Sequence, residues 1–337
     1  MKNNKLILII AVLLGVAALV LIYTKSSSTL KSEQRDFAVK DTNAITKIFL
    51  ADKTGKKALL ERKSASSWTV NGKYRVRRDA ILNLLEAIAG IDVKSPVGKA
   101  GHNTVIKDLA SGAIKVEIYK GDDLVKTYYV GSASPDQMGT YMLLEDSSTP
   151  FIMYKPGFEG YLTPRFIVFE SEWRDRKLFA YNEDEIKSID VLYNDKPENS
   201  FRIVQDGKAF VLMPKNPTFN GAAIDQVKLR TFVSGFKLLG VEFYLTNTRG
   251  VKDSVQKAAP FVVINITDNK GIQTQLKLVH KANPGYMDDK GKLFPYDMEH
   301  VYTQLGANNE DVGALMYIHI DRFLKTPADF VLDPAKK

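Results

Sequence analysis

The sequence of 337 residues contains no cysteine. This absence excludes disulfide bonds, thiol nucleophiles, cysteine-based zinc sites and the acylated cysteine of a lipoprotein anchor. The fold must therefore rely on packing alone. The chain is long enough for two domains of ordinary size, each with its own core.

The sequence also lacks the short motifs of common enzyme chemistry. It has no G-x-x-x-x-G-K-[ST] phosphate loop, no G-x-G-x-x-G dinucleotide motif and no G-x-S-x-G nucleophile turn. The small-residue run Gly131–Ser134 indicates a loop more simply than it indicates a nucleophile. We therefore expect no catalytic residues, no cofactor and no metal site, and a protein that is not an enzyme.

Histidine is scarce, and none of its positions shows the H-E-x-x-H metal spacing. The four are His102, His280, His300 and His319. His319 alternates with Ile318 and Ile320, which predicts a strand surface. Acidic residues surround His300 in a polar loop, and a solvated loop is the simpler interpretation of them. The residues in question are Asp288, Asp289, Asp297, Glu299 and His300.

One long apolar run is present, at Leu6–Tyr23, with Lys5 before it and Lys25 after it. A helix needs about 20 apolar residues to cross a membrane. The run predicts an uncleaved transmembrane anchor over residues 1–25, with the N-terminus in the cytoplasm and the bulk of the chain in the periplasm. The expected location is the inner membrane, as a single-pass protein. A cleaved signal peptide is the alternative.

The formal net charge is +8. In a translocated protein this favours anionic lipid head groups or an anionic envelope polymer over nucleic acid. Because the lysines are dispersed along the chain, a solubilising surface is the simpler interpretation. Aromatic residues offer stacking surfaces for sugar rings, and core packing is the simpler interpretation of each. These are Trp68, Trp173, Tyr128, Tyr129 and the stretch Tyr154–Tyr161. Three arginines before the first helix, Arg75, Arg77 and Arg78, suit an anionic partner or a solvated helix entry.

After a polar tether at 26–39, the order strand, hairpin, helix, glycine, strand, hairpin occurs twice. Amphipathic periodicity predicts the main helices at Asp79–Ala89 and Asp225–Leu239, each followed by glycine. Alternating apolar residues predict strands around these helices, among them a strand at Ala314–Ile318 and a hairpin of Ile114–Tyr119 and Leu124–Val130 around Lys120–Asp123. Between Lys94 and Ala113 they predict a loop with only a short helix at Val105–Leu109. We expect an α+β protein: a transmembrane helix and two similar domains, each a mostly antiparallel sheet on one main helix. The two domains are expected at 40–169 and 180–331, with a linker at 170–179 and a tail at 332–337.

Three stretches together resemble a known family. They are Trp68–Tyr74, Gly131 with Tyr141–Leu144, and Trp173–Arg176. The pattern is similar to domain-of-unknown-function family 4340, found in membrane-anchored bacterial proteins, in a form like that of Bacteroidota. The resemblance implies a link to auxiliary components of ABC transporters, including the gliding-motility type. It supplies no functional residues.

These observations predict a membrane-anchored, periplasm-facing accessory or scaffold protein of a cell-envelope complex. Its expected partners are the cytoplasmic membrane and ABC-transporter or other envelope subunits. One alternative is a binding module for glycan or an anionic envelope polymer. The other is an envelope hydrolase that uses carboxylates from the Asp288–His300 loop, with Asp289, Asp297 and His300 as the positions to test.

Overall fold

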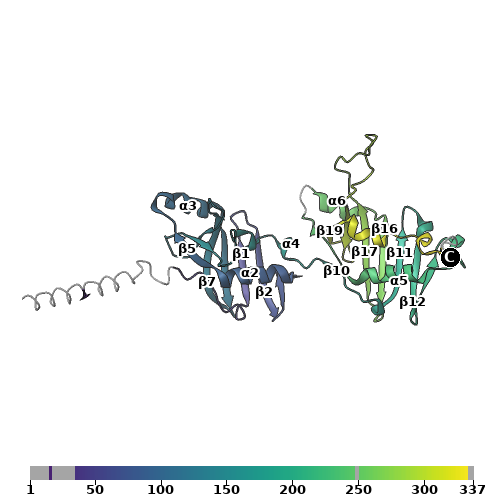
Figure 1. Cartoon of the computed structure of the whole chain (residues 1–337), viewed down its shortest axis with the longest axis horizontal. Helices are drawn as coiled ribbons and strands as arrows, with labels where there is room; N and C mark the ends of the chain where they lie inside the picture. Colours follow the sequence, from purple (N-terminus) through teal and green to yellow (C-terminus); the bar gives the residue numbers. More distant parts are fainter. Residues whose placement is uncertain (1–14, 17–34, 247–249, 333–337) are drawn as a thin grey trace, which may run out of the picture. The chain divides into compact units, whose positions relative to one another are not determined.

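A computed structural model describes residues 15–16, 35–246 and 250–332 of the chain. Contacts divide the chain into two compact units, of which unit 1 ends at Glu170 and unit 2 begins at Ser171. The point of division lies within a short helix, α4 (Glu170–Trp173). Each unit is a sheet with helices against it (Figure 1).

Unit 1 is built on a nine-stranded antiparallel sheet, because its strands alternate buried apolar side chains with exposed ones. The order is β4-β3-β2-β1-β6-β7-β8-β9-β5. The strands are β1 (Lys47–Ala51), β2 (Lys57–Ser64), β3 (Ser67–Val70), β4 (Tyr74–Arg75), β5 (Asp92–Pro96), β6 (Ile114–Lys120), β7 (Asp123–Ala133), β8 (Thr140–Leu144) and β9 (Phe151–Tyr154). The expected hairpin around Lys120–Asp123 is β6–β7, with Ile114 opposite Val130.

Unit 1 has two long helices, where the sequence predicted one. Helix α2 (Arg78–Gly90) has the expected apolar face, and Ile81, Leu84 and Ile88 are buried. Helix α3 (Lys99–Gly112) is far longer than the expected Val105–Leu109. It was underestimated because Val105 and Leu109 are its only buried residues, and they pack on half-buried residues of β7 and β8. A 3-10 turn, η2 (Thr163–Arg165), follows β9.

Unit 2 is built on an eight-stranded antiparallel sheet with the order β13-β12-β11-β16-β17-β18-β19-β15. Its strands are β11 (Ile186–Tyr193), β12 (Phe201–Asp206), β13 (Ala209–Pro214), β15 (Phe243–Tyr244), β16 (Val262–Asp268), β17 (Gln273–His280), β18 (His300–Leu305) and β19 (Asp311–Met316). A separate two-stranded sheet pairs β10 (Lys177–Phe179) with β14 (Leu239–Gly240). The described chain thus contains three sheets rather than the two expected.

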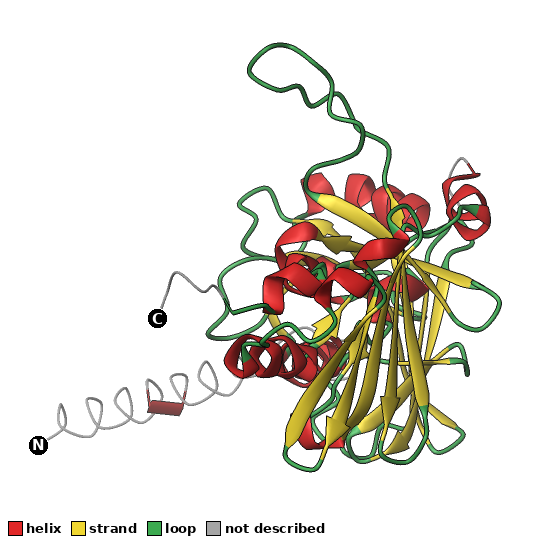
Figure 2. Cartoon of the chain, turned by 90° about the vertical axis from the view of Figure 1, so that its right-hand side faces the viewer, coloured by secondary structure: helices red, strands yellow, loops and turns green. Residues whose placement is uncertain are grey.

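The helices of unit 2 cover both faces of its sheet (Figure 2). Helix α5 (Gln226–Ser234) packs on the face of Leu278, and α6 (Val251–Lys257) on the face of Val279. The remaining helical segments are α7 (Tyr317–Ile320) and the 3-10 turns η3 (Glu183–Glu185), η4 (Pro197–Asn199), η5 (Pro217–Phe219), η6 (Gly235–Lys237), η8 (Asp321–Phe323) and η9 (Pro327–Phe330).

The expected helix Asp225–Leu239 ends early, at Ser234. Its last residues are diverted because Leu239 pairs with Phe179 in the small sheet. The strand expected at Ala314–Ile318 ends at Met316, so His319 lies in helix α7 and not on a strand. In both places a local apolar pattern fits more than one structure, and long-range packing decides between them.

The two sheets share one strand order. Without its edge strand β4, the unit 1 sheet runs β3-β2-β1-β6-β7-β8-β9-β5, and each strand has a counterpart at the same place in unit 2. Helix α2 follows β4 and α5 follows β13, whereas α3 precedes the β6–β7 hairpin and α6 precedes the β16–β17 hairpin. The order of elements that recurs in the sequence therefore recurs in the sheet topology.

The expected fold class and location need correction. A membrane-spanning helix requires about 20 apolar residues. No helix of the described residues is long and apolar enough to span a membrane, and the longest, α3, has 14 residues. The predicted anchor Leu6–Tyr23 lies outside the described residues apart from Gly15 and Val16. A transmembrane helix and a single-pass inner-membrane location are thus not supported.

Candidate functional site

A long connection joins β17 to β18 in unit 2. It spans residues 281–299, named the arm here, whereas the corresponding connection of unit 1, between β7 and β8, covers only residues 134–139. Loops longer than about 12–15 residues are uncommon in compact domains and usually functional. The arm rises from the edge of unit 2 beyond α6 (Figures 1 and 2). This difference between two otherwise matching sheets makes the arm the candidate site.

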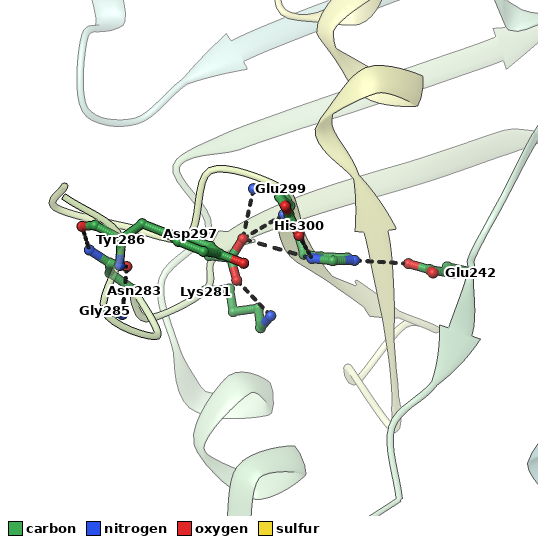
Figure 3. A network of polar contacts seen from close by, with 8 residues as sticks. All are labelled: Glu242, Lys281, Asn283, Gly285, Tyr286, Asp297, Glu299 and His300. Atoms are coloured by element: carbon green, nitrogen blue, oxygen red, sulfur yellow. Dashed lines mark hydrogen bonds and ion pairs between the residues drawn. The ribbon is translucent and has the colours of Figure 1, made fainter. Parts of the chain in front are cut away.

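The base of the arm is held by one carboxylate, Asp297 (Figure 3). Its Oδ1 accepts hydrogen bonds from the backbone amides of Glu299 and His300, at 2.7 and 2.8 Å. Its Oδ2 accepts one from the Lys281 ammonium at 2.6 Å. Lys281 is the first residue of the arm. The backbones of the two residues are also joined, because the Asp297 amide donates to the Lys281 carbonyl at 2.9 Å. The two ends of the arm are therefore tied together.

Burial acts to raise the pKa of the Asp297 carboxyl, but the hydrogen bonds from Lys281 and the two amides outweigh it and hold this pKa below its ordinary value. The residue is 2% exposed. An ionised carboxylate that is enclosed and bonded through both oxygens has no position from which to take a proton from a substrate. Asp297 fixes the shape of the arm.

His300 continues the network from the first position of β18. Its Nε2 lies 3.2 Å from an Oε atom of Glu242, and its Nδ1 lies 3.8 Å from Oδ1 of Asp297. The imidazole thus bridges the arm and the segment before β15 (Figure 3). Its two ring nitrogens both face carboxylates, which suits positioning of the arm.

The outer part of the arm is ordered by its own polar groups. The Asn283 side chain donates to the carbonyls of Tyr286 and Phe294, both at 2.8 Å, and accepts from the amides of Gly285 and Tyr286. Asp288 caps the far turn by accepting from the amides of Lys290 and Lys292. Asn and Asp commonly shape turns in this way. The arm is therefore a built hairpin.

This hairpin displays apolar side chains to solvent. Five large ones are exposed, at fractions between 41% and 58%: Tyr286, Met287, Leu293, Tyr296 and Met298. Met287 and Leu293 face each other across an isolated β-bridge. Single exposed apolar residues are ordinary, but several on one ordered projection mark an interaction site. Aromatic and methionine side chains are also the types enriched in protein interfaces.

A stack of three rings lies beside the base of the arm. The His280 imidazole is parallel to the rings of Phe261 and Tyr296, with centroids 3.9 and 3.6 Å away. Its Nε2 lies 3.8 Å from a carboxylate oxygen of Asp195. Burial lowers the pKa of His280 below its ordinary value, although the Asp195 charge opposes this. The folded protein therefore favours a neutral His280.

This pKa shift predicts that acid weakens unit 2. Because the unfolded chain takes up a proton at His280 more readily than the folded protein, the stabilisation is complete above about pH 6.5 and is lost as the pH falls through the lowered value. His280→Phe keeps a flat ring in the stack and cannot titrate. Urea midpoints between pH 7.5 and 5 should fall less for His280→Phe than for the unchanged protein. Equal declines would contradict the assignment.

The acidic residues singled out in the sequence divide between the two ends of the arm. Asp297, Glu299 and His300 meet at the base, whereas Asp288 shapes the far turn and Asp289 is exposed there. Within the described ranges, no group of three or more His, Asp or Glu side chains is placed to hold a metal ion. The hydrolase set Asp289, Asp297 and His300 is thus not brought together as one cluster.

The aromatic residues considered for sugar stacking are mostly enclosed. Trp68 is 3% exposed, and Trp173 and Tyr128 are fully buried. An enclosed ring offers no face to a sugar, so these three serve the core. Tyr129 and Tyr154 are half-buried, and in the 154–161 stretch Tyr161 is 37% exposed.

The other candidates have local structural partners. Ser134 donates its hydroxyl proton to Asp136 at 2.5 Å within the short β7–β8 turn. His102 Nε2 is 2.9 Å from the carbonyl of Ser148, and Arg77 lies 3.7 Å from Asp79 in the first turn of α2. Arg75 and Arg78 are exposed, and His319 is exposed in α7.

Sequence reasoning missed several residues that build the arm. It noted the acids of this segment but not Lys281 or Asn283, nor the distant Glu242. One signal was available: Asn283, Pro284 and Gly285 are a strong turn sequence just after a predicted strand. The pairing of Glu242 with His300 depends on strand neighbours that are far apart in the chain.

A family model with the description "Domain of unknown function (DUF4340)" matches residues 68–259. No curated protein and no solved structure matches the sequence. The family match covers most of unit 1 and the first part of unit 2, and it ends before the arm begins.

Proposed function

The chain belongs to the family described as a domain of unknown function, DUF4340, and from this premise we propose that it is a non-enzymatic accessory or scaffold protein that holds a partner protein on the arm. The family description names no activity, so the proposal rests on the site. The observation that supports the proposal most strongly is an ordered hairpin on which five large apolar side chains are exposed.

An ordered hairpin of this kind is suited to binding. Fully burying one large apolar side chain contributes about 1.5–3 kcal/mol. In the free protein Met287 and Leu293 are 58% and 55% exposed, so most of this burial energy is still available for binding a partner. Because Asp297, Asn283 and Asp288 already fix the backbone, a partner would not bear the ordering cost that a flexible loop imposes.

The surface chemistry of the arm defines the kind of partner. Its apolar side chains require a protein with an apolar groove. The charges at the far turn are mixed, with Asp288 and Asp289 beside Lys290 and Lys292, so steering by charge is expected to be weak. Subunits of ABC transporters are the partners that the family resemblance suggests, and they are the first to look for.

Replacing Tyr286, Met287 and Leu293 together with serine is expected to lower recovery of the partner at least tenfold after crosslinking in cells, since tenfold corresponds to only about 1.4 kcal/mol. The variant leaves Asn283, Asp288 and Asp297 in place, so the backbone of the arm is retained. Recovery is measured by quantitative mass spectrometry of the purified full-length chain.

A matched control carries three serines at exposed apolar positions elsewhere. Ile272, Leu124 and Met213 are 58%, 53% and 51% exposed. The control should recover the partner as the unchanged protein does. Undiminished recovery with the arm variant, or an equal loss with the control, would refute the role of the arm.

The alternative of a glycan or anionic-polymer binding module has less support. Its stacking surface is reduced by the burial of Trp68, Trp173 and Tyr128. What remains is the net charge of +8. Binding through charge weakens steeply with salt, whereas binding through the apolar arm does not. The salt dependence of partner recovery therefore distinguishes these two functions.

A further inference from the structure

Unit 2 contains a pocket of about 410 Å³ between α5 and the segment that holds η8 and η9. None of its lining residues belongs to the arm. Val227 supplies an exposed apolar wall, Phe232 and Phe330, which are 5% and 2% exposed, close the floor, and Lys228, Arg322 and Lys325 supply positive charge. Small-molecule sites have volumes of about 300–1,000 Å³ and combine apolar walls with a few polar groups in this way.

The two walls of the pocket are fastened to each other. The rings of Phe232 and Phe330 meet edge to face with centroids 5.4 Å apart. The amide of Asp225 donates to the Phe330 carbonyl at 2.8 Å, and the Asp225 side chain caps α5 by accepting from the amides of Val227 and Lys228. The pocket is therefore formed before any ligand arrives.

Positive charge at the pocket is incompletely neutralised. The lining acid, Asp329, is engaged by the amide and hydroxyl of Thr326 at 2.7 and 2.9 Å. Lys325 lies 3.9 Å from Asp321. For Lys228, no ion pair within 4.0 Å is present among the described residues, and its side chain is exposed. An anion would therefore be favoured at the rim.

The apolar wall is also incompletely covered. Val227 is 76% exposed although it stands on a helix that packs against the core. A phosphate or acetate ion would leave this wall uncovered, and a neutral hydrocarbon would give Lys228 no counter-charge. Only a molecule with both features satisfies the pocket.

We propose that this pocket, the α5 pocket, binds an alkyl carboxylate: the chain lies against Val227, Phe232 and Phe330, and the carboxylate faces Lys228 and Lys325. Binding involves no bond formation or cleavage. The site lies outside the arm, and its occupancy does not depend on the partner protein.

The test uses the purified full-length chain and four probes below their micelle concentrations: decanoate, decanol, decyltrimethylammonium and acetate. Calorimetry should show saturable binding of decanoate at one site. The other three probes should bind at least tenfold more weakly. Failure of decanoate to bind, or equal binding of decanol, would overturn the proposal.

Lys228→Glu reverses one charge of the pocket and should preserve folding, because an acid in the first turn of a helix is favourable. The variant should bind decanoate at least tenfold more weakly and decyltrimethylammonium more tightly than the unchanged protein. Lys187→Glu makes the same charge change at an exposed position of β11 and should leave both affinities unchanged. Equal effects of the two variants would show a general charge effect and refute the site.

A second variant tests the apolar wall. Gly235 has space for a side chain, since a Cβ there would meet Phe323 and Arg322 at ordinary contact distances of 3.5 and 3.7 Å. Gly235→Leu should fill the pocket and abolish decanoate binding, with Gly235→Ala intermediate. Unchanged binding in Gly235→Leu, with the fold verified by circular dichroism, would contradict the location.

Discussion

Phe236→Ala is expected to lower the free energy of unfolding of unit 2 by about 3–5 kcal/mol, the range measured for large-to-small changes of buried aromatic residues. The side chain is fully buried in η6. Its ring lies 4.5 Å from that of Phe323, 5.4 Å from Phe232 and 5.7 Å from Phe179. Alanine would leave a cavity among rings that belong to three separate segments of the chain, and none of them can move in without losing its own contacts.

Native-state hydrogen exchange, read by mass spectrometry, can assign this loss to one unit. A loss of about 3 kcal/mol corresponds to roughly a hundredfold faster exchange. Peptides of β11 and β16 should show it, while peptides of β1 and β6 in unit 1 serve as the internal reference. Leu238→Ala is the matched control, because Leu238 is 64% exposed and lies two residues away. Exchange in Phe236→Ala within fivefold of the unchanged protein would contradict the central role of this ring.

Strands were predictable from the sequence because burial on one face imposes a visible alternation. Ile114–Tyr119 and Leu124–Val130 were expected as a hairpin, and they correspond to β6 and β7. Helix α2 was equally visible from the spacing of its apolar residues. In these segments the local pattern and the tertiary contacts favour the same structure, so the sequence alone is enough.

The misses have a common physical cause. Helix α3 buries only Val105 and Leu109, and α6 only Val255, so neither has the continuous apolar stripe from which a helix is inferred. Phe236 and Leu239 continue the periodicity of α5, but Leu239 is taken by the pairing with β10. The length and ends of these helices depend on contacts with residues far away in the chain, and a local sequence pattern carries no information about such contacts.

The candidate site was visible in part. The segment Asp288–His300 was noted for its acids, whereas the property that matters in the structure is the exposure of Met287, Leu293 and their neighbours. Exposure of an apolar residue cannot be inferred from its type, because most such residues are buried. The enclosure of Asp297 likewise required the fold.

Asp311→Ala is expected to destabilise unit 2 by about 3–5 kcal/mol, because it removes the carboxylate that pairs with an enclosed cation. Asp311 opens β19 and pairs with Arg174, and their side chains are only 10% and 11% exposed. Lys252 lies 3.5 Å from the same carboxylate, and the Arg174 guanidinium lies 3.6 Å above the ring of Tyr244. The carboxylate thus balances two cations, one of which is enclosed against an aromatic face and cannot turn out to water.

The double variant Arg174→Met/Asp311→Ala separates this charge effect from lost packing. Methionine fills much of the space of the arginine stem without a charge, so the double variant should be more stable than Asp311→Ala by at least about 1–2 kcal/mol in urea denaturation, as expected when a buried pair is replaced together. If the double variant were as unstable as Asp311→Ala, the enclosed charge would not be the source of the loss. Asp311 would then act through its own backbone contact, where its carboxylate accepts from the Val312 amide at 3.2 Å. Recovery in the double variant would instead show that the loss in Asp311→Ala comes from the enclosed charge of Arg174, and that apolar packing can replace the ion pair at this place.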